Sequence, residues 1–477
     1  MKILMVSPEC YPFAKVGGLG DVVGALPKKL ASYGHDVRIC LPLYGSIHPQ
    51  GKRYDNVVVR LGGHNRICRL WEQSQDGLIY YFIEYQQYFS DSRIYIDGPN
   101  NGERFAFFCR AALDMCVNQQ WIPDIIHCHD WTTGLIPIYL NTNAFEYNLN
   151  KAATVFTIHN LEHQGIFQPD LLAYAGIPFS EFRSDSVESL GCINFMKGAL
   201  YHATKITTVS PTYAKEIQTS TLGCGLQHVL KFKAGDLIGI LNGIDENIWD
   251  PETDPFLTEH YSLKNLKPKF LCKKNLRTQL NLPDNTGPIL GIISRLYPQK
   301  GLDVFLDVAP YLLKNMQIQI VIIGSGDPNW EARCRALEQQ FPNQVRTFIG
   351  YNGTLAHQVE AGCDLFLMPS RFEPCGLNQI YSMRYGTLPI VRATGGLVDT
   401  VDSLDETTGQ GCGFIFSDLC PDAIYNTIGW ACSVYYNKPE VFINMQRTAM
   451  AKDFSWNKSA RKYEEVYHWT IQQRQQI

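Results

Sequence analysis

Several features are scarce in this sequence, and each scarcity excludes a class of protein. Charged residues make up only 18% of the 477 residues and the formal net charge is −4, so the chain lacks the positive excess that attracts nucleic acid or an anionic membrane surface. No apolar run approaches the roughly 20 residues that a helix needs to span a bilayer. The chain is rich in hydrophobic residues, at 45%, which excludes disorder. We therefore expect a globular protein that binds any anionic ligand through a local basic cluster.

Closely spaced cysteines are also missing. The 15 cysteines are scattered singly without a CxxC pair, which favours reduced thiols and no disulfides in a cytosol-like compartment. The chain starts directly with the buried-strand pattern of residues 1–6, so we expect no targeting peptide before the fold. These features predict a cytoplasmic protein.

What the sequence does contain is an alternation of short apolar runs with segments of helical spacing. The length allows two or three domains, and the runs fall into two series separated by residues 246–286, which are rich in Pro, Lys and Asn. We predict an α/β protein with two doubly wound Rossmann-like domains facing a cleft between them. The expected boundaries are 1–245, 246–455 and a C-terminal amphipathic helix, 456–477, that packs back across the domain crossing.

A glycine-rich segment separates the first predicted strand, residues 3–7, from the first predicted helix, residues 22–33. Strand, loop and helix in this order can place backbone N–H groups on a diphosphate, and Lys15 lies beside the glycines. A dinucleotide fingerprint does not fit, because ten residues separate Ser7 from Gly18 and the next apolar run, 37–42, ends without an acid.

Polar side chains follow two more predicted strands of the first series. The strand at 124–129 ends in Asp130, a candidate for binding sugar hydroxyls, and the strand at 153–158 ends in His159. His127 and His129 share one face of their strand, but no third or fourth ligand is signalled nearby, so we expect no metal site.

The second series has its own polar strand ends. Arg295 and Lys300 lie around a turn after the first strand of this series. The Arg guanidinium could bind a diphosphate through two parallel N–H groups, and the Lys ammonium could add a compact positive charge. Glu373 follows the apolar run 364–368 and precedes a predicted helix at 377–385. For each of these residues the alternative is an ordinary solvated side chain.

Seven segments together carry a resemblance to a known family. They are Lys15-Val-Gly-Gly-Leu-Gly-Asp21, residues 127–131, Thr157-Ile-His-Asn160, Asn242-Gly243, residues 294–301, Ser370-Arg-Phe-Glu-Pro-Cys-Gly376 and Thr394-Gly-Gly-Leu397. The chain resembles the bacterial glycogen synthases and plant-type starch synthases over essentially its whole length. The resemblance implies a glycosyltransferase-B fold and retaining transfer of glucose from ADP-glucose or UDP-glucose to the non-reducing end of an α-1,4-glucan.

The resemblance also implies roles for individual residues. Glu373 would hold the donor glucose, His159 would lie near its anomeric and C6 region, Arg295 and Lys300 would clamp the diphosphate, and Lys15 and Asp130 complete the catalytic set. The implied donor-binding residues are Gly17, Gly18, Asp21, Asn160, Asn242, Tyr351, Cys375, Gly376, Leu377, Thr394, Gly395 and Gly396. Tyr95 and Trp131 are the aromatic candidates for acceptor binding.

One position departs from many retaining enzymes of this fold. Those enzymes carry a second Glu eight residues after the first, where it binds ribose, whereas this chain has Tyr381, as we expect for synthases of this family. No firm nucleophile is evident either, so we expect front-face transfer in which the departing phosphate accepts the proton of the acceptor.

Three other functions remain open. An α-glucan phosphorylase would need pyridoxal phosphate, a sucrose synthase would accept fructose, and a non-catalytic glucan-binding protein would have no use for a diphosphate clamp. We expect no cofactor, no metal, no nucleic acid and no membrane partner. The choice between ADP-glucose and UDP-glucose, and association with glucan particles, are left open by the sequence.

Overall fold

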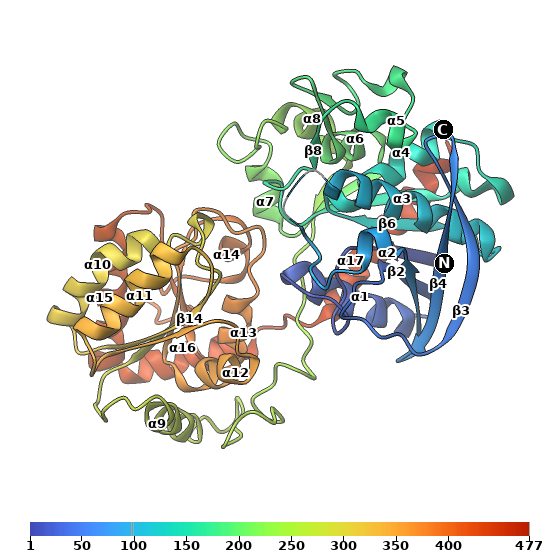
Figure 1. Cartoon of the computed structure of the whole chain (residues 1–477). Helices are drawn as coiled ribbons and strands as arrows, with labels where there is room; N and C mark the ends of the chain where they lie inside the picture. Colours follow the sequence, from blue (N-terminus) through green and yellow to red (C-terminus); the bar gives the residue numbers. More distant parts are fainter. Residues whose placement is uncertain (97, 99, 477) are drawn as a thin grey trace. The chain divides into compact units, whose positions relative to one another are not determined.

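The computed structural model describes residues 1–96, 98 and 100–476, and it divides the chain into two compact units (Figure 1). Unit 1 contains residues 1–243 and the C-terminal segment from Trp456, and unit 2 contains Ile244–Ser455. Each unit is built around its own sheet and is described by itself below.

Unit 1 is organised around a nine-stranded sheet with the order β12-β11-β7-β6-β1-β2-β5-β4-β3. All neighbours pair in parallel except β3 with β4 and β4 with β5, which are antiparallel. The strands are β1 (Lys2–Val6), β2 (Asp36–Pro42), β3 (Lys52–Leu61), β4 (His64–Gln75), β5 (Leu78–Glu84), β6 (Ile125–His129), β7 (Ala153–Ile158), β11 (Lys205–Thr208) and β12 (Leu237–Gly239). The central strands β1, β6 and β7 are buried on both faces, which is why they read as continuous apolar runs.

Helices lie on both sides of this sheet (Figure 1). They are α1 (Gly18–Ser32), α2 (Gln86–Phe89), α3 (Asn100–Asn118), α4 (Leu135–Thr142), α5 (Leu171–Ala175), α6 (Phe195–His202), α7 (Pro211–Glu216), α8 (Gln227–Phe232) and α17 (Trp456–Gln475). Side-chain caps set two of their starts, because Asn194 accepts from the Lys197 N–H at 2.9 Å and Ser210 accepts from the Tyr213 N–H at 3.1 Å.

The C-terminal helix α17 starts at Trp456, as predicted, and packs within unit 1. Its apolar face, with Tyr463, Val466 and Tyr467, belongs to the same buried core as the central strands. The helix contacts α1, β6 and β7. The last helix of the chain therefore supports the sheet that begins with the first strand.

Unit 2 contains a six-stranded, fully parallel sheet with the order β15-β14-β13-β16-β17-β18. The strands are β13 (Ile289–Ile293), β14 (Gln319–Gly324), β15 (Val345–Ile349), β16 (Leu365–Met368), β17 (Leu388–Arg392) and β18 (Phe414–Phe416). The helices are α9 (Lys269–Gln279), α10 (Leu302–Asn315), α11 (Pro328–Gln340), α12 (Gly353–Gly362), α13 (Asn378–Arg384), α14 (Gly395–Thr400), α15 (Pro421–Asn437) and α16 (Pro439–Ala451).

Successive residues of the central strand β13 enter two different cores. Leu290 and Ile292 pack in one core with residues of α10, α11 and α15, whereas Ile289 packs in another with residues of α9 and α12. This follows from the two-residue period of a strand, whose side chains point alternately to the two faces. The sheet is thus covered on both sides, as its all-apolar strands require.

The structure corrects one element boundary and adds strands that were not predicted. Helix α1 starts at Gly18 instead of Val22, because Gly17 is the extended residue before the helix and the Gly20 N–H bonds the Gly17 carbonyl at 3.2 Å. Strand β18 and the small sheet β8 (Ile166–Phe167), β10 (Cys192–Asn194) and β9 (Glu188–Ser189) have two or three residues each, too few for a periodic signal. In the described part of the chain, no helix has the length and apolar character to cross a membrane.

Candidate functional site

The predicted residues Arg295, Lys300 and Glu373 of unit 2 follow the carboxyl ends of strands β13 and β16. Strand β13 comes first along the chain, β14 and β15 continue to one side of it, and β16 starts the other side. In an open parallel sheet this reversal of strand order opens a crevice that binds ligands. The segments after β13 and β16 carry Arg295, Lys300 and Glu373, so the fold places all three at the point where the strand order reverses.

Lys300 and Glu373 form a buried ion pair. The Lys300 Nζ lies 2.9 Å from Oε1 and 2.7 Å from Oε2 of Glu373, and Ser370 Oγ donates to the same Oε2 at 2.8 Å. The two side chains are only 17% and 7% exposed. The alternative that Glu373 is an ordinary solvated side chain is therefore wrong. Its carboxylate is buried and is held in place by the Lys300 ammonium and the Ser370 hydroxyl group.

Backbone contacts tie the Glu373 segment to its two neighbours. The Gly396 N–H donates to the carbonyl of Glu373 at 3.1 Å, and a Cβ atom at Gly396 would lie 2.1 Å from the Cys375 carbonyl oxygen. On the other side Gly301, with φ +65°, approaches the Pro369 carbonyl so closely that a Cβ atom would lie 1.9 Å away. Glycine is required at both positions, and the three segments form one packed edge.

The other predicted residues of unit 2 differ in their surroundings. Arg295 is exposed and donates to Gln299 Oε1 at 3.3 Å. Cys375 is 4% exposed, Thr394 is 2% exposed and precedes α14, and Leu377 precedes α13. Gly376 has φ +73° and Gly395 has φ +47°, which places the backbone in the left-handed region at two points of this edge. Tyr351 follows the edge strand β15 and is 87% exposed. Strand β14 lies between β15 and β13, so Tyr351 does not follow a strand next to those that carry Lys300 and Glu373.

In unit 1 the strand order reverses between β1 and β6, and the predicted residues again gather there. Lys15 Nζ lies 2.7 Å from Asp21 Oδ1, so the cation is paired within its own segment. Glu9 Oε2 accepts the N–H groups of Val16 and Gly17 at 2.7 and 3.0 Å, and Glu9 Oε1 accepts from the Tyr95 hydroxyl at 2.9 Å. The N–H groups expected to face a phosphate are thus partly used by Glu9, whose carboxyl pKa is raised by burial.

Asp130 connects the ends of β6 and β7. Its Oδ1 accepts the backbone N–H of His159 at 2.8 Å and that of Asn160 at 3.4 Å, while its own N–H donates to Thr157 O at 3.0 Å. Its backbone has φ 58° and ψ 179°, a region that residues with a Cβ rarely adopt and that costs about 1–3 kcal/mol. Burial raises the pKa of the Asp130 carboxyl to about 7.

His159 is half-buried and touches a second histidine. Its Nε2 lies 3.0 Å from His129 Nδ1, and the His129 ring lies over that of His127 with 4.1 Å between centroids. His127 in turn contacts Tyr467 OH of α17 at 2.8 Å and Thr157 Oγ1 at 2.6 Å. Burial lowers the pKa of His159 to about 3, so its ring is neutral near pH 7.

The remaining predicted residues of unit 1 have mainly structural contacts. Asn160 Oδ1 accepts the Glu162 N–H at 3.0 Å, and Gly18 is the first residue of α1. Trp131 packs edge-to-face on Phe105 with ring centroids 5.2 Å apart, whereas Tyr95 is 38% exposed. Asn242 is 5% exposed, and in the described part of the chain its Oδ1 has no hydrogen-bond partner.

Sequence reasoning missed three residues of these edges: Glu9, His129 as a partner of His159, and Ser370. Glu9 could have been noticed as an acid that comes two residues after the first strand-like run. The partners of His129 and Ser370 had no signal of their own, because each contact depends on how two segments fold together.

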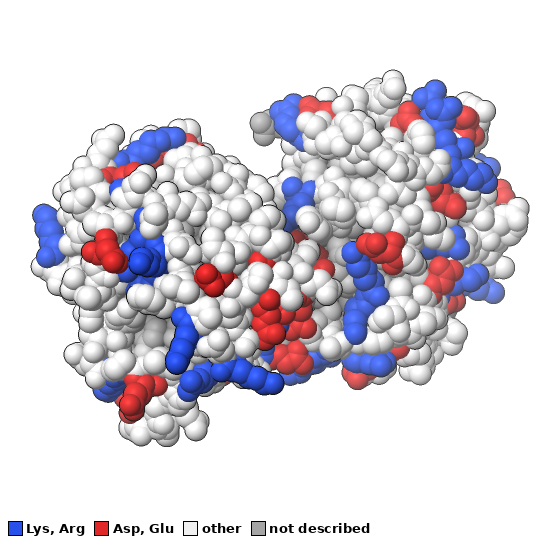
Figure 2. All heavy atoms as spheres, turned by 90° about the horizontal axis from the view of Figure 1, so that it is seen from below, with Lys and Arg blue, Asp and Glu red and all other residues white. Residues whose placement is uncertain are grey.

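The structure contains no evident metal site among its described residues, since no three or more His, Cys, Asp or Glu side chains are grouped to hold an ion. On the face shown in Figure 2, acidic and basic side chains are interspersed over a mostly uncharged surface in both units.

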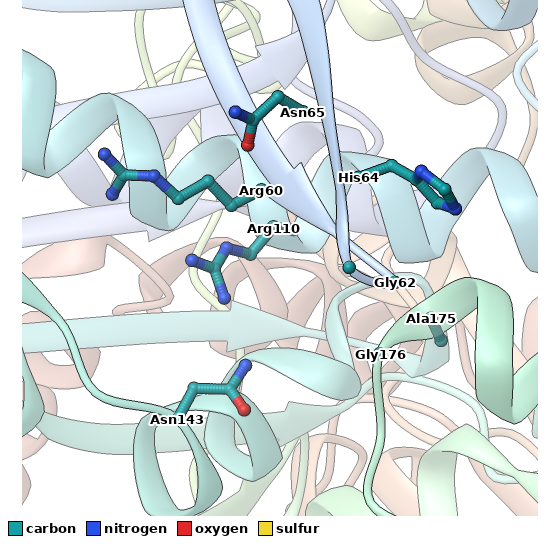
Figure 3. A pocket seen from close by; sticks show the side chains of 9 residues that line it. Arg60, Gly62, His64, Asn65, Arg110, Asn143, Ala175 and Gly176 are labelled. Carbon is teal, nitrogen blue, oxygen red and sulfur yellow. The ribbon is translucent and has the colours of Figure 1, made fainter.

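A cavity of about 380 Å³ lies in unit 1 away from these edges, at the turn between β3 and β4 (Figure 3). Arg60 and Arg110 point into it together, but each already has an acidic partner. Arg110 binds Asp114 through two contacts of 2.9 and 3.1 Å, and Arg60 lies 3.6 Å from Glu146. The cavity contains none of the predicted site residues.

Comparisons with known proteins agree along the whole chain. Residues 2–232 match the starch synthase catalytic domain family, and residues 273–448 match the glycosyl transferases group 1 family. The chain is 42% identical over 487 residues to glycogen synthase 1 of Geobacter sulfurreducens, covering 99% of this chain and 97% of that protein. It is 43% identical over 478 residues to the glycogen synthase of Geobacillus stearothermophilus, with coverage of 99% and 98%.

A solved structure is similar over the same extent. The catalytic domain of starch synthase IV from Arabidopsis thaliana, bound to ADP and acarbose, has a TM-score of 0.92 and 36% identity, and 99% of each chain is covered.

Proposed function

The chain belongs to the glycogen synthase and starch synthase family of glycosyltransferases, and on that premise we propose that it transfers glucose from ADP-glucose to the non-reducing end of an α-1,4-glucan. The fold is glycosyltransferase-B, and the enzyme is a hexosyltransferase. ADP-glucose is the proposed donor because the 36% identical starch synthase IV was solved with ADP. Transfer with retention at the anomeric carbon is part of the proposal.

The observation that carries the proposal is the buried Lys300–Glu373 pair at the crevice of unit 2. We assign the Glu373 carboxylate to the hydroxyl groups of the donor glucose and the Lys300 ammonium to the diphosphate. Both groups are preorganised, since Ser370 and Lys300 hold the carboxylate within hydrogen-bond distance. A cation fixed in advance stabilises the negative charge that grows on a leaving phosphate without reorganisation at the moment of reaction.

The proposed chemical step needs no nucleophile from the protein. The bond between the anomeric carbon and the phosphate oxygen breaks, the 4-hydroxyl oxygen of the acceptor attacks from the same face, and its proton passes to the departing phosphate oxygen. Arg295 and Lys300 stabilise the diphosphate charge, and the Glu373 carboxylate favours positive charge on the ring. The configuration at the anomeric carbon is retained because the phosphate leaves and the acceptor attacks on the same face of the sugar.

In unit 1 we propose that Lys15 and the first turn of α1 bind the phosphates, and that His159 contacts the donor sugar. Glu9 supports this role indirectly, because it holds the backbone of Val16 and Gly17 just before the helix. Asp130 shapes the same edge by fixing the backbone at His159. Tyr95 and Trp131 remain the proposed acceptor contacts.

We further propose that transfer requires no metal ion and no cofactor, because Arg295 and Lys300 supply positive charge for the diphosphate. Saturating EDTA should leave the rate unchanged. A requirement for added Mg²⁺ would contradict this part of the proposal.

One assay tests the function. The purified chain is given ADP-glucose or UDP-glucose with soluble glucan, and both nucleoside diphosphate release and chain lengthening are measured. We expect release with ADP-glucose that depends on the glucan and is matched by elongation. Release of nucleoside diphosphate with fructose in place of glucan would indicate a sucrose synthase. Elongation of glucan from glucose 1-phosphate would indicate a phosphorylase. Glucan binding without nucleoside diphosphate release would indicate a non-catalytic protein.

A further inference from the structure

The second histidine at the end of β6 has no role in the function proposed so far. His129 is completely buried, and its Nδ1 lies 3.0 Å from Nε2 of His159. This contact directs Nε2 of His159 toward the protein interior. The other ring nitrogen of His159, Nδ1, makes no hydrogen bond within the described residues, so it is the one available to a ligand.

The proton count of this contact limits the possible arrangements. Burial lowers the pKa of His159 to about 3 and that of His129 well below its usual value, so both rings are neutral near pH 7. A neutral imidazole carries one N–H donor and one acceptor nitrogen. The two nitrogens that face each other therefore share one proton, which belongs either to His129 or to His159.

The surroundings of the remaining His129 nitrogen decide between them. Its Nε2 is buried and has no hydrogen-bond partner among the residues that the structure describes. If the shared proton belonged to His159, the neutral His129 would carry its own proton on Nε2, as a buried N–H group without an acceptor. Buried N–H groups without acceptors are rare in folded proteins because their desolvation is not compensated.

We propose that His129 donates from Nδ1 to Nε2 of His159 and thereby fixes His159 as the tautomer with its proton on Nδ1. His129 is then a positioning residue, and His159 presents an N–H donor, not a lone pair, to the ligand. Resting on the proposed function, this N–H binds a hydroxyl oxygen of the donor glucose. The same arrangement, in which a second group fixes the tautomer of a functional imidazole, is common where one nitrogen must perform a defined task.

The first experiment observes the protons directly in the ligand-free protein. Nitrogen-15 NMR of the histidine-labelled chain distinguishes protonated from unprotonated ring nitrogens, and a His159→Asn variant identifies the His159 signals. We expect a proton on Nδ1 and none on Nε2 of His159. A proton on Nε2 of His159 in the wild-type protein would overturn the proposal, whatever the activity.

The second experiment tests the consequence for catalysis. His129→Leu removes the donor, and His159 should then redistribute its proton while turnover falls by roughly 10–100-fold, by analogy with the loss of a group that orients a metal-binding histidine. His129→Asn, whose side-chain amide can donate from nearly the position of Nδ1, should restore the wild-type tautomer and most of the turnover. The KM for glucan should not change in either variant.

Tyr467→Phe is the matched control, because it removes the 2.8 Å contact to the neighbouring His127 without touching His159. It should leave the His159 tautomer and the turnover unchanged. Loss of turnover in His129→Leu with an unchanged tautomer would assign His129 to packing and overturn the proposal. The tautomer is measured without substrate, so a protein with the expected tautomer but without transferase activity would refute only the proposed function.

Discussion

Replacing Lys300 by Met is the sharpest perturbation of the proposed chemistry. The methionine keeps most of the side-chain volume but removes the ammonium group that lies 2.7 and 2.9 Å from the two Glu373 oxygens. Because this cation is preorganised for charge that grows on the leaving diphosphate, its loss should lower turnover by about 10²–10³, or about 3–4 kcal/mol of transition-state stabilisation. The KM for glucan should stay near the wild-type value, since the cation does not contact the acceptor.

The assay measures initial rates of ADP release at saturating glucan while ADP-glucose is varied. Lys438→Met is the matched control, because Lys438 also pairs with an acid, Glu406 at 2.9 Å, but both side chains are 46% exposed. An exposed, solvent-screened pair of this kind contributes little to stability and should not affect turnover. Wild-type turnover in Lys300→Met would refute the assignment of this cation to the transition state.

A double variant tests whether the pair acts as one unit. Lys300→Met leaves the Glu373 carboxylate buried with the Ser370 hydroxyl as its remaining side-chain partner among the described residues, and Glu373→Gln removes that unpaired charge. If the two residues work together, the double variant should lose no more activity than the more damaging single variant. Strictly additive losses would show that the two side chains act independently in spite of their contact.

Other predictions concern the two edges separately. Glu373→Gln should lower transfer by about 10²–10³ with a smaller loss of donor binding, whereas Cys375→Ser should keep substantial activity, as steady-state kinetics and donor titration will show. Loss of transfer in Cys375→Ser alone would reverse these roles, and a covalent glucosyl-cysteine would then be sought by mass spectrometry. Gly396→Ala should lower both thermal stability and donor affinity, because its Cβ would lie 2.1 Å from the Cys375 carbonyl oxygen, whereas Gly235→Ala, with no atom within 4 Å of the added Cβ, should do neither. Burial raises the pKa of the Asp130 carboxyl from 3.8 to about 7 in the folded protein. As the pH rises from 3.8 to about 7, the carboxyl therefore ionises in the unfolded state before it ionises in the folded state. The free energy of unfolding falls over this range, and the fall ends near pH 7. Asp130→Asn should therefore gain thermal stability relative to wild type as the pH rises through this window, and a pH-independent difference in melting temperature would contradict the raised pKa.

Local sequence patterns were sufficient for the architecture and for the residues at the strand ends. Continuous apolar runs such as 365–368 predicted strands buried on both faces, and the polar residues after them predicted which side chains reach the carboxyl edge. The motifs around Lys15 and Glu373 also indicated the family, which the comparisons confirm.

Helix α1 shows where local patterns gave the wrong boundary. Gly18 and Gly20 read as a loop because glycine has low helix propensity, but the first turn of a helix tolerates it, and tertiary packing of Leu19, Val22 and Val23 outweighs that cost. The two- and three-residue strands were missed for the related reason that they have no period to detect.

The sequence by itself determined which residues lie at the ends of strands, because a continuous apolar run and the polar residues that follow it are local properties. Only the tertiary structure decided which of these residues meet. Lys300 and Glu373 are 73 positions apart and touch because β16 lies beside β13, although β14 and β15 come between them along the chain. His129 and His159 meet in the same way across β6 and β7. Strand order is set by the packing of the whole sheet and its helices, so no local pattern could have predicted these contacts.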